Sequence, residues 1–402
     1  MGKEFLLYTL RPIKLYLILY VLVLLLLWIF QSSINYEIGI GFIFITLLNI
    51  LFCFSLYSFP LSKLNTYLSP PKYSILHKLV KLMLTINFFI ILYLISNYID
   101  VLKTGVAISV YRSSLFGDKS IKDYYGAFAA YLFFYCTIIP IFGISYGVFR
   151  KIVFSDKKIL IISLILLTLK EVILVSRFYL FPTFLTMLLL LYCFDIKMTR
   201  KRVVFYILLL FTPIVLAFVL KSNGSLDTAF TNARNYLIVG YSLFSNSIDT
   251  GLVDKLMELG SPYAFLGIFS SFFYDKIDFF DKIQEFIYLG DAGYFNAFYT
   301  SLLLPYLYGG FLGSVICTIL FGLLISYNLY RLTIRVSFYN FNALFSLLLL
   351  FFSYQFTPVQ LTFFWDYFYL SLLVQLTRFL FMKKINIFGG DCGKKSNNNS
   401  VV

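Results

Sequence analysis

Ten apolar segments, with one long acidic loop between the seventh and the eighth, constrain this chain more than any other feature. Hydrophobic residues make up 60% of its 402 residues and charged residues only 13%, whereas about 25% of the residues in a soluble domain are charged. A soluble core could not bury 48 Phe and 33 Tyr beside the many Leu and Ile, but a bilayer can. The composition predicts an all-α, polytopic integral membrane protein, because lipid leaves the backbone no partner outside the helix.

A helix needs about 20 predominantly apolar residues to cross a bilayer. By this criterion the predicted spans are 13–31, 38–59, 79–99, 126–149, 159–176, 178–195, 203–220, 306–330, 339–356 and 363–382. The fifth and sixth are nearly continuous, and Lys170–Glu171 interrupts the fifth, so this pair could be a helical hairpin or a re-entrant feature. We expect residues 1–388 to form one membrane domain and 389–402 a disordered cytoplasmic tail.

The positions of the basic residues predict the orientation of these spans. Lys and Arg cluster at alternate segment ends, most densely within 63–81, 150–158, 197–202 and 378–384. Cytoplasmic loops carry such an excess of positive charge, so both termini are predicted to be cytoplasmic. The segments 100–125, 176–178, 221–305 and 357–362 then lie outside. The net charge of +14 is explained by this topology, and nucleic acid is not expected as a partner.

The large outer loop, 221–305, contains two predicted amphipathic helices. From Leu226 to Ile248 the apolar residues recur every three or four positions, and Arg234 lies on the flank of that stripe, where lipid phosphates would be in reach. In the second helix, over 275–288, apolar residues share one side and the acids Asp278, Asp281 and Glu285 the other. This helix either rests on the bilayer with its acids in water or presents an acidic wall to a polar substrate.

A glycine- and aromatic-rich stretch, 290–314, leads from the outer loop into the eighth span. Its glycines could permit tight helix packing where the chain returns to the membrane. Alternatively, its aromatic rings, such as that of Tyr294, form a platform on which a sugar stacks, while Asp291 and Asn296 supply hydrogen bonds.

Few basic residues are predicted on the outer side, so Arg112, Arg177 and Arg234 stand out. Arg binds phosphate oxygens through two parallel hydrogen bonds and stays protonated, so the three residues could together hold a diphosphate. Each could also be an interfacial anchor. The single histidine, His77, falls in the predicted cytoplasmic loop 60–81, where a structural or solvent-exposed role is expected. A histidine-based catalyst or a histidine-ligated metal on the outer side is therefore excluded, and neither metal nor cofactor is predicted.

This arrangement resembles the Wzy family, the polymerases of O-antigen and oligosaccharide repeat units in bacteria. The matching features are the length, the number of spans, the large outer loop before the last spans and the outward arginines. The most specific stretch is the pattern NAFYT…YGGFLGS at 296–314, joined by YRSS at 111–114 and SRF at 176–178. The related O-antigen ligases share the layout but rely on an outer-loop histidine, which this chain lacks, so the resemblance favours a polymerase.

The resemblance implies a glycosyltransferase of the bacterial inner membrane whose donor and acceptor are both undecaprenyl-diphosphate-linked oligosaccharides. Arg177 and Arg234 would hold the leaving diphosphate, with Arg112 assisting. Asp291 is the first candidate for the base that activates the acceptor hydroxyl, and Asp366 the second. The flippase and the chain-length regulator of the same pathway would be partners. A lipid-linked oligosaccharide flippase or another transporter is the alternative, for which Lys170 and Glu171 supply charge within a span; a scaffolding subunit is a third possibility.

Overall fold

The computed structural model describes about half of the predicted membrane domain, almost entirely as helices. The described residues are 39–56, 75–103, 136–173, 179–194, 242–249, 286–288, 294–296, 303–334, 337–356 and 366–373, with isolated positions at 17–29, 58, 201, 208, 227 and 251. The longer helices are α2 (Ile40–Ser55), α3 (Ile75–Lys103), α6 (Ile138–Phe154), α7 (Lys158–Ile173), α8 (Leu180–Phe194), α13 (Leu303–Ile334) and α14 (Phe338–Phe356).

Each of these seven helices coincides with one predicted apolar segment, so the helical prediction is confirmed for them. α3 begins at Ile75, inside the stretch predicted as a cytoplasmic loop. α7 and α8 are two separate helices whose near ends meet at Lys170 and Tyr179, which supports the hairpin interpretation. At a rise of 1.5 Å per residue, α7 and α8 are each about 24 Å long. Two shorter helices cover 242–249 and 366–373.

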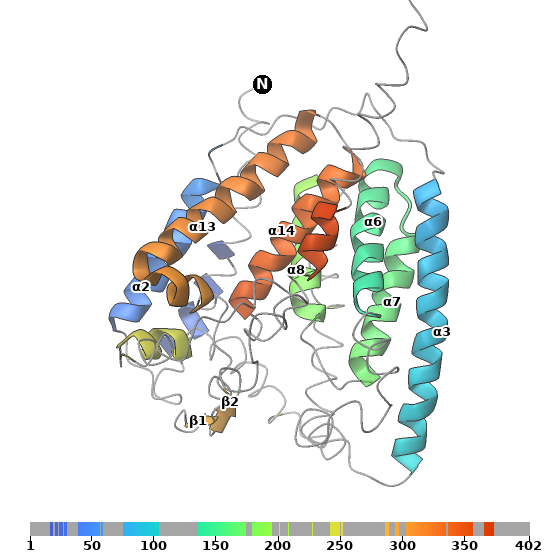
Figure 1. Cartoon of the computed structure of the whole chain (residues 1–402), viewed down its shortest axis with the longest axis horizontal. Coiled ribbons are helices and arrows are strands. Elements are labelled where there is room, and N and C mark those ends of the chain that lie inside the picture. The colour runs from blue at the N-terminus through green and yellow to red at the C-terminus, as the bar shows by residue number, and fades with distance from the viewer. Residues whose placement is uncertain are drawn as a thin grey trace, which may run out of the picture.

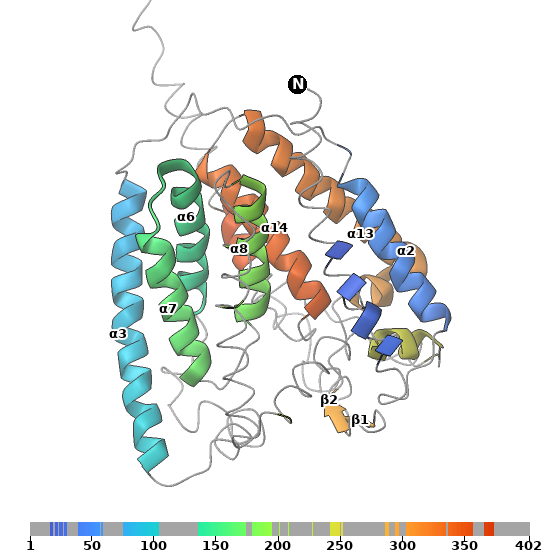
Figure 2. The same cartoon turned by 180° about the vertical axis from the view of Figure 1, so that it is seen from behind.

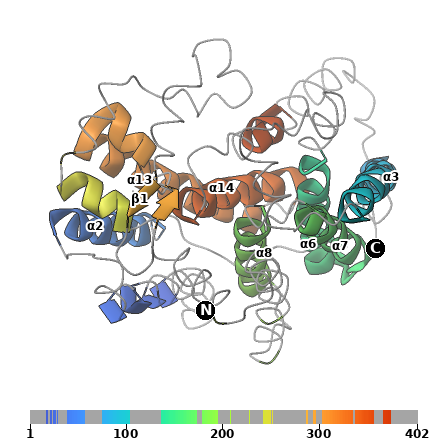
Figure 3. The same cartoon turned by 90° about the horizontal axis from the view of Figure 1, so that it is seen from below.

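The helices form a bundle with two flanks. α2 and α13 lie side by side on one flank, α3, α6 and α7 on the other, and α14 and α8 between them (Figures 1 and 2). Seen from below, α14 crosses the centre of the bundle and connects the flanks (Figure 3). Contacts of α14 with α6, α8 and α13 hold the two flanks together.

Small residues bring α6 and α7 into close contact. A Cβ on Gly147 would lie 2.5 Å from the backbone nitrogen of Leu160, and one on Gly143 would meet the hydroxyl of Ser163. Glycines four residues apart on one helix face allow two backbones to approach in this way. The turn between the helices begins with a left-handed residue, Ser155, at φ 58°.

The basic residues gather at one end of the bundle. The start of α3 and the end of α6 meet where the rings of His77 and Tyr146 lie 6.1 Å apart, and Phe149 brings in the start of α14 through Phe338, at 5.6 Å. This end, called the basic end below, carries Lys78, Lys81, Arg150, Lys151, Lys157, Lys158 and Arg331. In the described parts of the same helices, the opposite end carries Lys103 and Lys170.

Part of the large loop packs against the start of α2. Residues 242–249 are helical, as predicted, and Phe244, Ser242 and Ser245 are buried. The ring of Phe244 lies 6.4 Å from that of Phe44, and Asp249 accepts a 3.0 Å hydrogen bond from the backbone N–H of Gly41. The described part of this helix is therefore held by the bundle itself.

The second predicted loop helix is wrong at its C-terminal end. Phe286–Tyr288 form strand β1, which pairs antiparallel with β2 (Tyr294–Asn296), Ile287 opposite Phe295. The physical reason lies in the sequence, where Gly290 and Gly293 disfavour a helix that continues and the aromatic residues favour strands. Residues 275–285, including the three acids, lie outside the described residues. This ribbon adds a short β element to a structure that is otherwise helical where it is described.

Two helices in the described part of the chain are long and apolar enough to cross a membrane, judged by length and composition alone. They are Leu76–Asp100 and Tyr308–Leu332, both with a mean hydropathy of 2.1 in their most apolar window. The apolar helices Ile40–Ser55, Pro182–Leu191 and Phe338–Leu350 are shorter.

Candidate functional site

A buried charge pair lies near the end of α7, opposite the basic end. The side chains of Lys170 and Glu171 are each 1% exposed, and Lys170 Nζ lies 3.6 Å from Glu171 Oε1. Two adjacent residues on a helix project in directions about 100° apart, so the pair reaches the bundle interior from neighbouring faces of α7. The two residues that interrupt the fifth apolar segment are thus inside the protein.

Residues from two other helix ends surround the lysine. Lys170 Nζ donates a hydrogen bond to the hydroxyl of Thr137, one residue before α6 begins. It also lies 4.3 Å from the centroid of the Tyr179 ring, which precedes α8. An ammonium over an aromatic face is attracted by the ring quadrupole. The end of α7 and the starts of α6 and α8 therefore converge on one cation.

A second carboxylate lies close enough to this group to act on it electrostatically. Asp366 begins the helix 366–373 and is half-buried, and its charge acts on the hydroxyl of Tyr179, as does the charge of Glu171. We name these five residues, Thr137, Lys170, Glu171, Tyr179 and Asp366, the Lys170 cluster. It combines one cation, two carboxylates and two hydroxyls in a setting largely shielded from water. Such a group can neutralise an anion or exchange a proton, because charges interact more strongly where the local dielectric is low.

A hydrogen-bonded network fixes the helix that carries Asp366. Asn342 of α14 accepts hydrogen bonds from the hydroxyls of Ser145 and Tyr367, both at 2.8 Å, and donates to Ser371 Oγ at 2.9 Å. All four residues are buried. The network ties helix 366–373 to α6 and α14 and so sets the position of Asp366, the neighbour of Tyr367. The sequence analysis missed it, although an Asn inside an apolar segment was an available signal.

The structure describes few of the predicted site residues. Arg112, Arg177, Arg234 and Asp291 lie outside the described residues, and Arg177 is two positions before Tyr179 in the sequence. Tyr294 and Asn296 are placed only through their backbone, in β2. Among the predicted site residues that the structure describes, Asp366 belongs to the Lys170 cluster.

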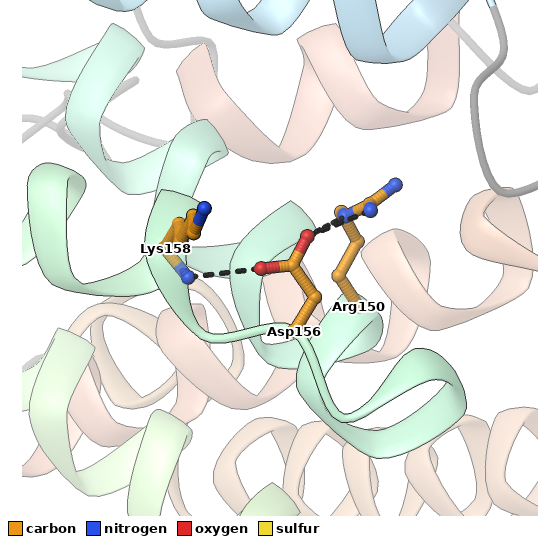
Figure 4. A network of polar contacts seen from close by, with 3 residues as sticks. All are labelled: Arg150, Asp156 and Lys158. Atoms are coloured by element: carbon orange, nitrogen blue, oxygen red, sulfur yellow. Dashed lines mark hydrogen bonds and ion pairs between the residues drawn. The ribbon is translucent and has the colours of Figure 1, made fainter.

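The basic end has its own buried ion pair, which closes the turn between α6 and α7 (Figure 4). Arg150 is 1% exposed, and its Nη2 and Nε atoms lie 2.7 Å and 3.0 Å from Asp156 Oδ2. The other oxygen of Asp156 accepts the backbone N–H of Lys158 at 3.1 Å. His77 is buried beside this pair, so its structural interpretation is supported and its solvent-exposed one is wrong. This group stabilises the turn, and it lies far along α6 from Thr137.

We expect Asp156→Asn to lower the free energy of unfolding by about 1.5–3 kcal/mol at pH 7, because Arg150 loses a charge-assisted partner. Burial raises the pKa of the Asp156 carboxyl, but hydrogen bonds from Arg150 and Lys158 hold it, on balance, below its ordinary value. Its stabilising effect is therefore fully present above about pH 4 and is lost as the pH falls through the lower, folded pKa.

Thermal unfolding of the purified protein between pH 7 and pH 3 tests this expectation. The wild-type protein should lose thermal stability as Asp156 is protonated, and the Asp156→Asn variant should not show this part of the decrease. Asp100→Asn is the matched control, since the Lys103–Asp100 pair is 71% and 67% exposed and such pairs contribute little. Equal effects of the two substitutions would contradict the assignment.

Comparisons of this chain with protein-family models, with curated proteins and with solved structures find no match. The chemistry of the Lys170 cluster therefore has to be argued from its own residues.

Proposed function

We propose that this chain is a polytopic membrane glycosyltransferase that polymerises undecaprenyl-diphosphate-linked oligosaccharide repeat units at the outer face of a bacterial inner membrane. The observation that carries the proposal is the separation of charge along the bundle. Basic residues collect at one end, while a buried cation with two carboxylates, the Lys170 cluster, lies at the other. In this topology the basic end is cytoplasmic and the Lys170 cluster lies on the side of the outer leaflet.

The exposed apolar faces support a membrane setting. In the most apolar windows of α3 and α13, only 28% of the residues are buried, whereas the core helix of a soluble protein is mostly buried. On α3 the exposed side chains include Leu82, Ile86 and Phe89. A continuous apolar surface of this kind requires lipid or a partner to cover it. Ionisable residues inside such a bundle are costly and mark functional sites.

The proposed reaction transfers the growing glycan from its lipid diphosphate to the non-reducing end of a new repeat unit. The bond between the anomeric carbon and the diphosphate oxygen breaks, and a bond to the acceptor hydroxyl oxygen forms. A carboxylate accepts the hydroxyl proton; Asp366 is the stronger candidate, because it belongs to the Lys170 cluster. The released diphosphate keeps its negative charge, which Arg177, Arg234 and Lys170 would stabilise.

Deletion of the gene, followed by analysis of the surface glycan, tests the proposal. We expect the deletion strain to display a single repeat unit, because units still reach the outer leaflet but are no longer joined. Restoring the wild-type gene should restore long chains, and restoring Asp366→Asn at equal protein abundance should not. Full-length glycan in the deletion strain would rule out the polymerase.

A transporter is the second candidate, favoured by the buried Lys170–Glu171 pair. Proton and ion carriers use such intramembrane pairs, and their sites lie between helices inside the bundle. A lipid-linked oligosaccharide flippase is the nearest example. The same deletion distinguishes the two candidates, since a strain without its flippase displays no repeat unit at all. The flippase and the chain-length regulator of the pathway are proposed partners of the polymerase.

We predict ten spans with both termini in the cytoplasm, on the basis of the charge separation. A reporter fused after Leu220 should register outside and one fused after Lys384 inside. Fusions within 221–305 that register inside would overturn the topology and the functional proposal together, because the Lys170 cluster would then lie on the side of the wrong leaflet.

A further inference from the structure

α13 is interrupted at two consecutive glycines near its start. Gly309 has φ −148° and ψ 18°, and Gly310 has φ 57° and ψ −148°, so the element consists of a short helix over 303–308 and a long one over 311–334. The backbone region of Gly310 is accessible essentially to glycine alone. The sequence YGGFLG therefore encodes a break, and the break lies at the opposite end of the bundle from the basic residues, where α13 begins.

The long helix after the break has the general properties of an anion site. The first N–H groups of a helix lack acceptors within it, and the aligned peptide dipoles give its N-terminus a partial positive charge. Phosphates bind at such ends. Transporters use interrupted helices in the same way, with half-helix N-termini directed at anionic groups. This geometry alone fits many helices, so a ligand needs independent support.

Ser314, in the first turn of the long helix, supplies that support. Its side chain is 1% exposed, and its hydroxyl has no hydrogen-bond partner in the structure as described. In a continuous helix a serine can donate to the carbonyl four residues before it, but here that residue is Gly310, where the break redirects the backbone. The Cα–Cβ bond of a helical residue tilts toward the N-terminus, so the side chain of Ser314 leaves the helix on the side toward the break.

The space beside the break is open, and its rim is apolar. A Cβ on Gly309 or on Gly310 would meet no atom within 4 Å, so tight packing does not explain these two glycines; Gly313 does make a close approach, to the carbonyl of Pro305. Phe311 and Leu312 are 52% and 66% exposed. Hydrogen-bond donors behind an exposed apolar rim suit an amphiphilic ligand. Its charged group would reach the backbone N–H groups while its hydrocarbon chains remain in the lipid.

We propose that the break at Gly309–Gly310 binds a lipid-borne phosphate, held by the backbone amides at the start of the 311–334 helix and by the hydroxyl of Ser314. The proposal rests on the membrane setting and lipid-diphosphate substrate proposed above, and it gives that substrate a binding site away from the arginines. Polyprenyl diphosphates and anionic phospholipids share this chemistry, and the experiment separates them.

The test uses the full chain purified in dodecyl maltoside, which carries no phosphate, and titrates it with undecaprenyl diphosphate, with phosphatidylglycerol and with inorganic pyrophosphate. We expect saturable binding of undecaprenyl diphosphate. Ser314→Ala should weaken it about tenfold, equivalent to about 1.4 kcal/mol, without lowering the melting temperature of the unliganded protein, because the hydroxyl has no bond to lose. Gly309→Ala should also weaken binding, since its methyl enters the open space.

Ser326→Ala is the matched control on the same helix. Its hydroxyl donates to the carbonyl of Leu56 at 3.0 Å, so this variant should lose thermal stability and keep its affinity. Binding of phosphatidylglycerol with the same dependence on Ser314 would support the site and identify its occupant as a phospholipid. Pyrophosphate binding as tightly as the lipids, or binding unchanged in both Ser314→Ala and Gly309→Ala, would overturn the proposal.

The outcome is separable from that of the proposed function. If the chain fails to polymerise glycan but binds lipid phosphate through Ser314, the proposed site is supported and the proposed polymerase function is refuted. If the chain polymerises glycan and all variants bind the lipid equally well, the polymerase function is supported and the proposed site is refuted.

Discussion

Replacing Lys170 with Met lowers the free energy of unfolding by about 3–5 kcal/mol, the cost of removing one member of a buried ion pair. The size of this effect follows from burial, since both side chains are 1% exposed and Glu171 would keep its charge without the neighbouring ammonium. Protein abundance in the membrane and thermal unfolding in detergent both report it. Wild-type stability in this variant would mean that the pair contributes nothing to the fold.

The double variant Lys170→Met/Glu171→Leu separates structure from chemistry. Replacing a buried pair by apolar residues of similar volume is often neutral or stabilising, so the double variant should recover most of the lost abundance. If the Lys170 cluster takes part in polymerisation, glycan chains stay short despite that recovery. Lys103→Met is the control, because its pair with Asp100 is exposed and its loss should change neither stability nor chain length.

Alanine at Arg177 or at Arg234 should impair polymerisation about ten- to a hundredfold while the protein still inserts. A lost charge-assisted contact costs roughly 1.5–3 kcal/mol, which becomes this factor in rate if the contact acts in the transition state. Lys should impair activity only in part, since it keeps the charge but loses the planar fork of donors. The measurement is glycan chain length at matched protein abundance.

Two comparisons make the arginine prediction specific. Arg331→Ala removes a cation at the basic end and should leave chain length unchanged. If Arg177 or Arg234 instead pairs with an acid of the loop, the alanine variant should lose abundance, and neutralising the partner acid should partly restore it. Wild-type chain length in both alanine variants at equal abundance would end the diphosphate hypothesis.

The helices could be predicted from the sequence because each is a local pattern of apolar residues, long enough to be distinguished from a strand. The ribbon could not be predicted in the same way. Phe286 and Ile287 fit both a helical stripe and a strand, so periodicity alone does not distinguish the two. The break in α13 was also missed, since an unbroken apolar segment hides a change of backbone direction that only Gly309 and Gly310 signal.

The candidate site was predicted only in part for a different reason. Lys170 and Thr137 are 33 positions apart, and no local pattern indicates that two such residues meet. Asp366 was singled out by its position near a span end, but its proximity to Tyr179 depends on how four helices pack. The network around Asn342 likewise joins residues from three helices. Long-range pairing of this kind is set by packing, which the sequence periodicity does not encode.

The contact between Asp249 and α2 has a consequence for the order in which the chain can assemble. Gly41 and Asp249 are 208 positions apart, and α13, the long helix beside α2, is synthesised later still. Protein synthesis proceeds at about 5–20 residues per second. Asp249, the described partner of α2 in the loop, is therefore synthesised roughly 10–40 s after Gly41. In the membrane setting proposed above, lipid or a chaperone of the insertion machinery would cover the aromatic face of α2, including Phe44, during that interval.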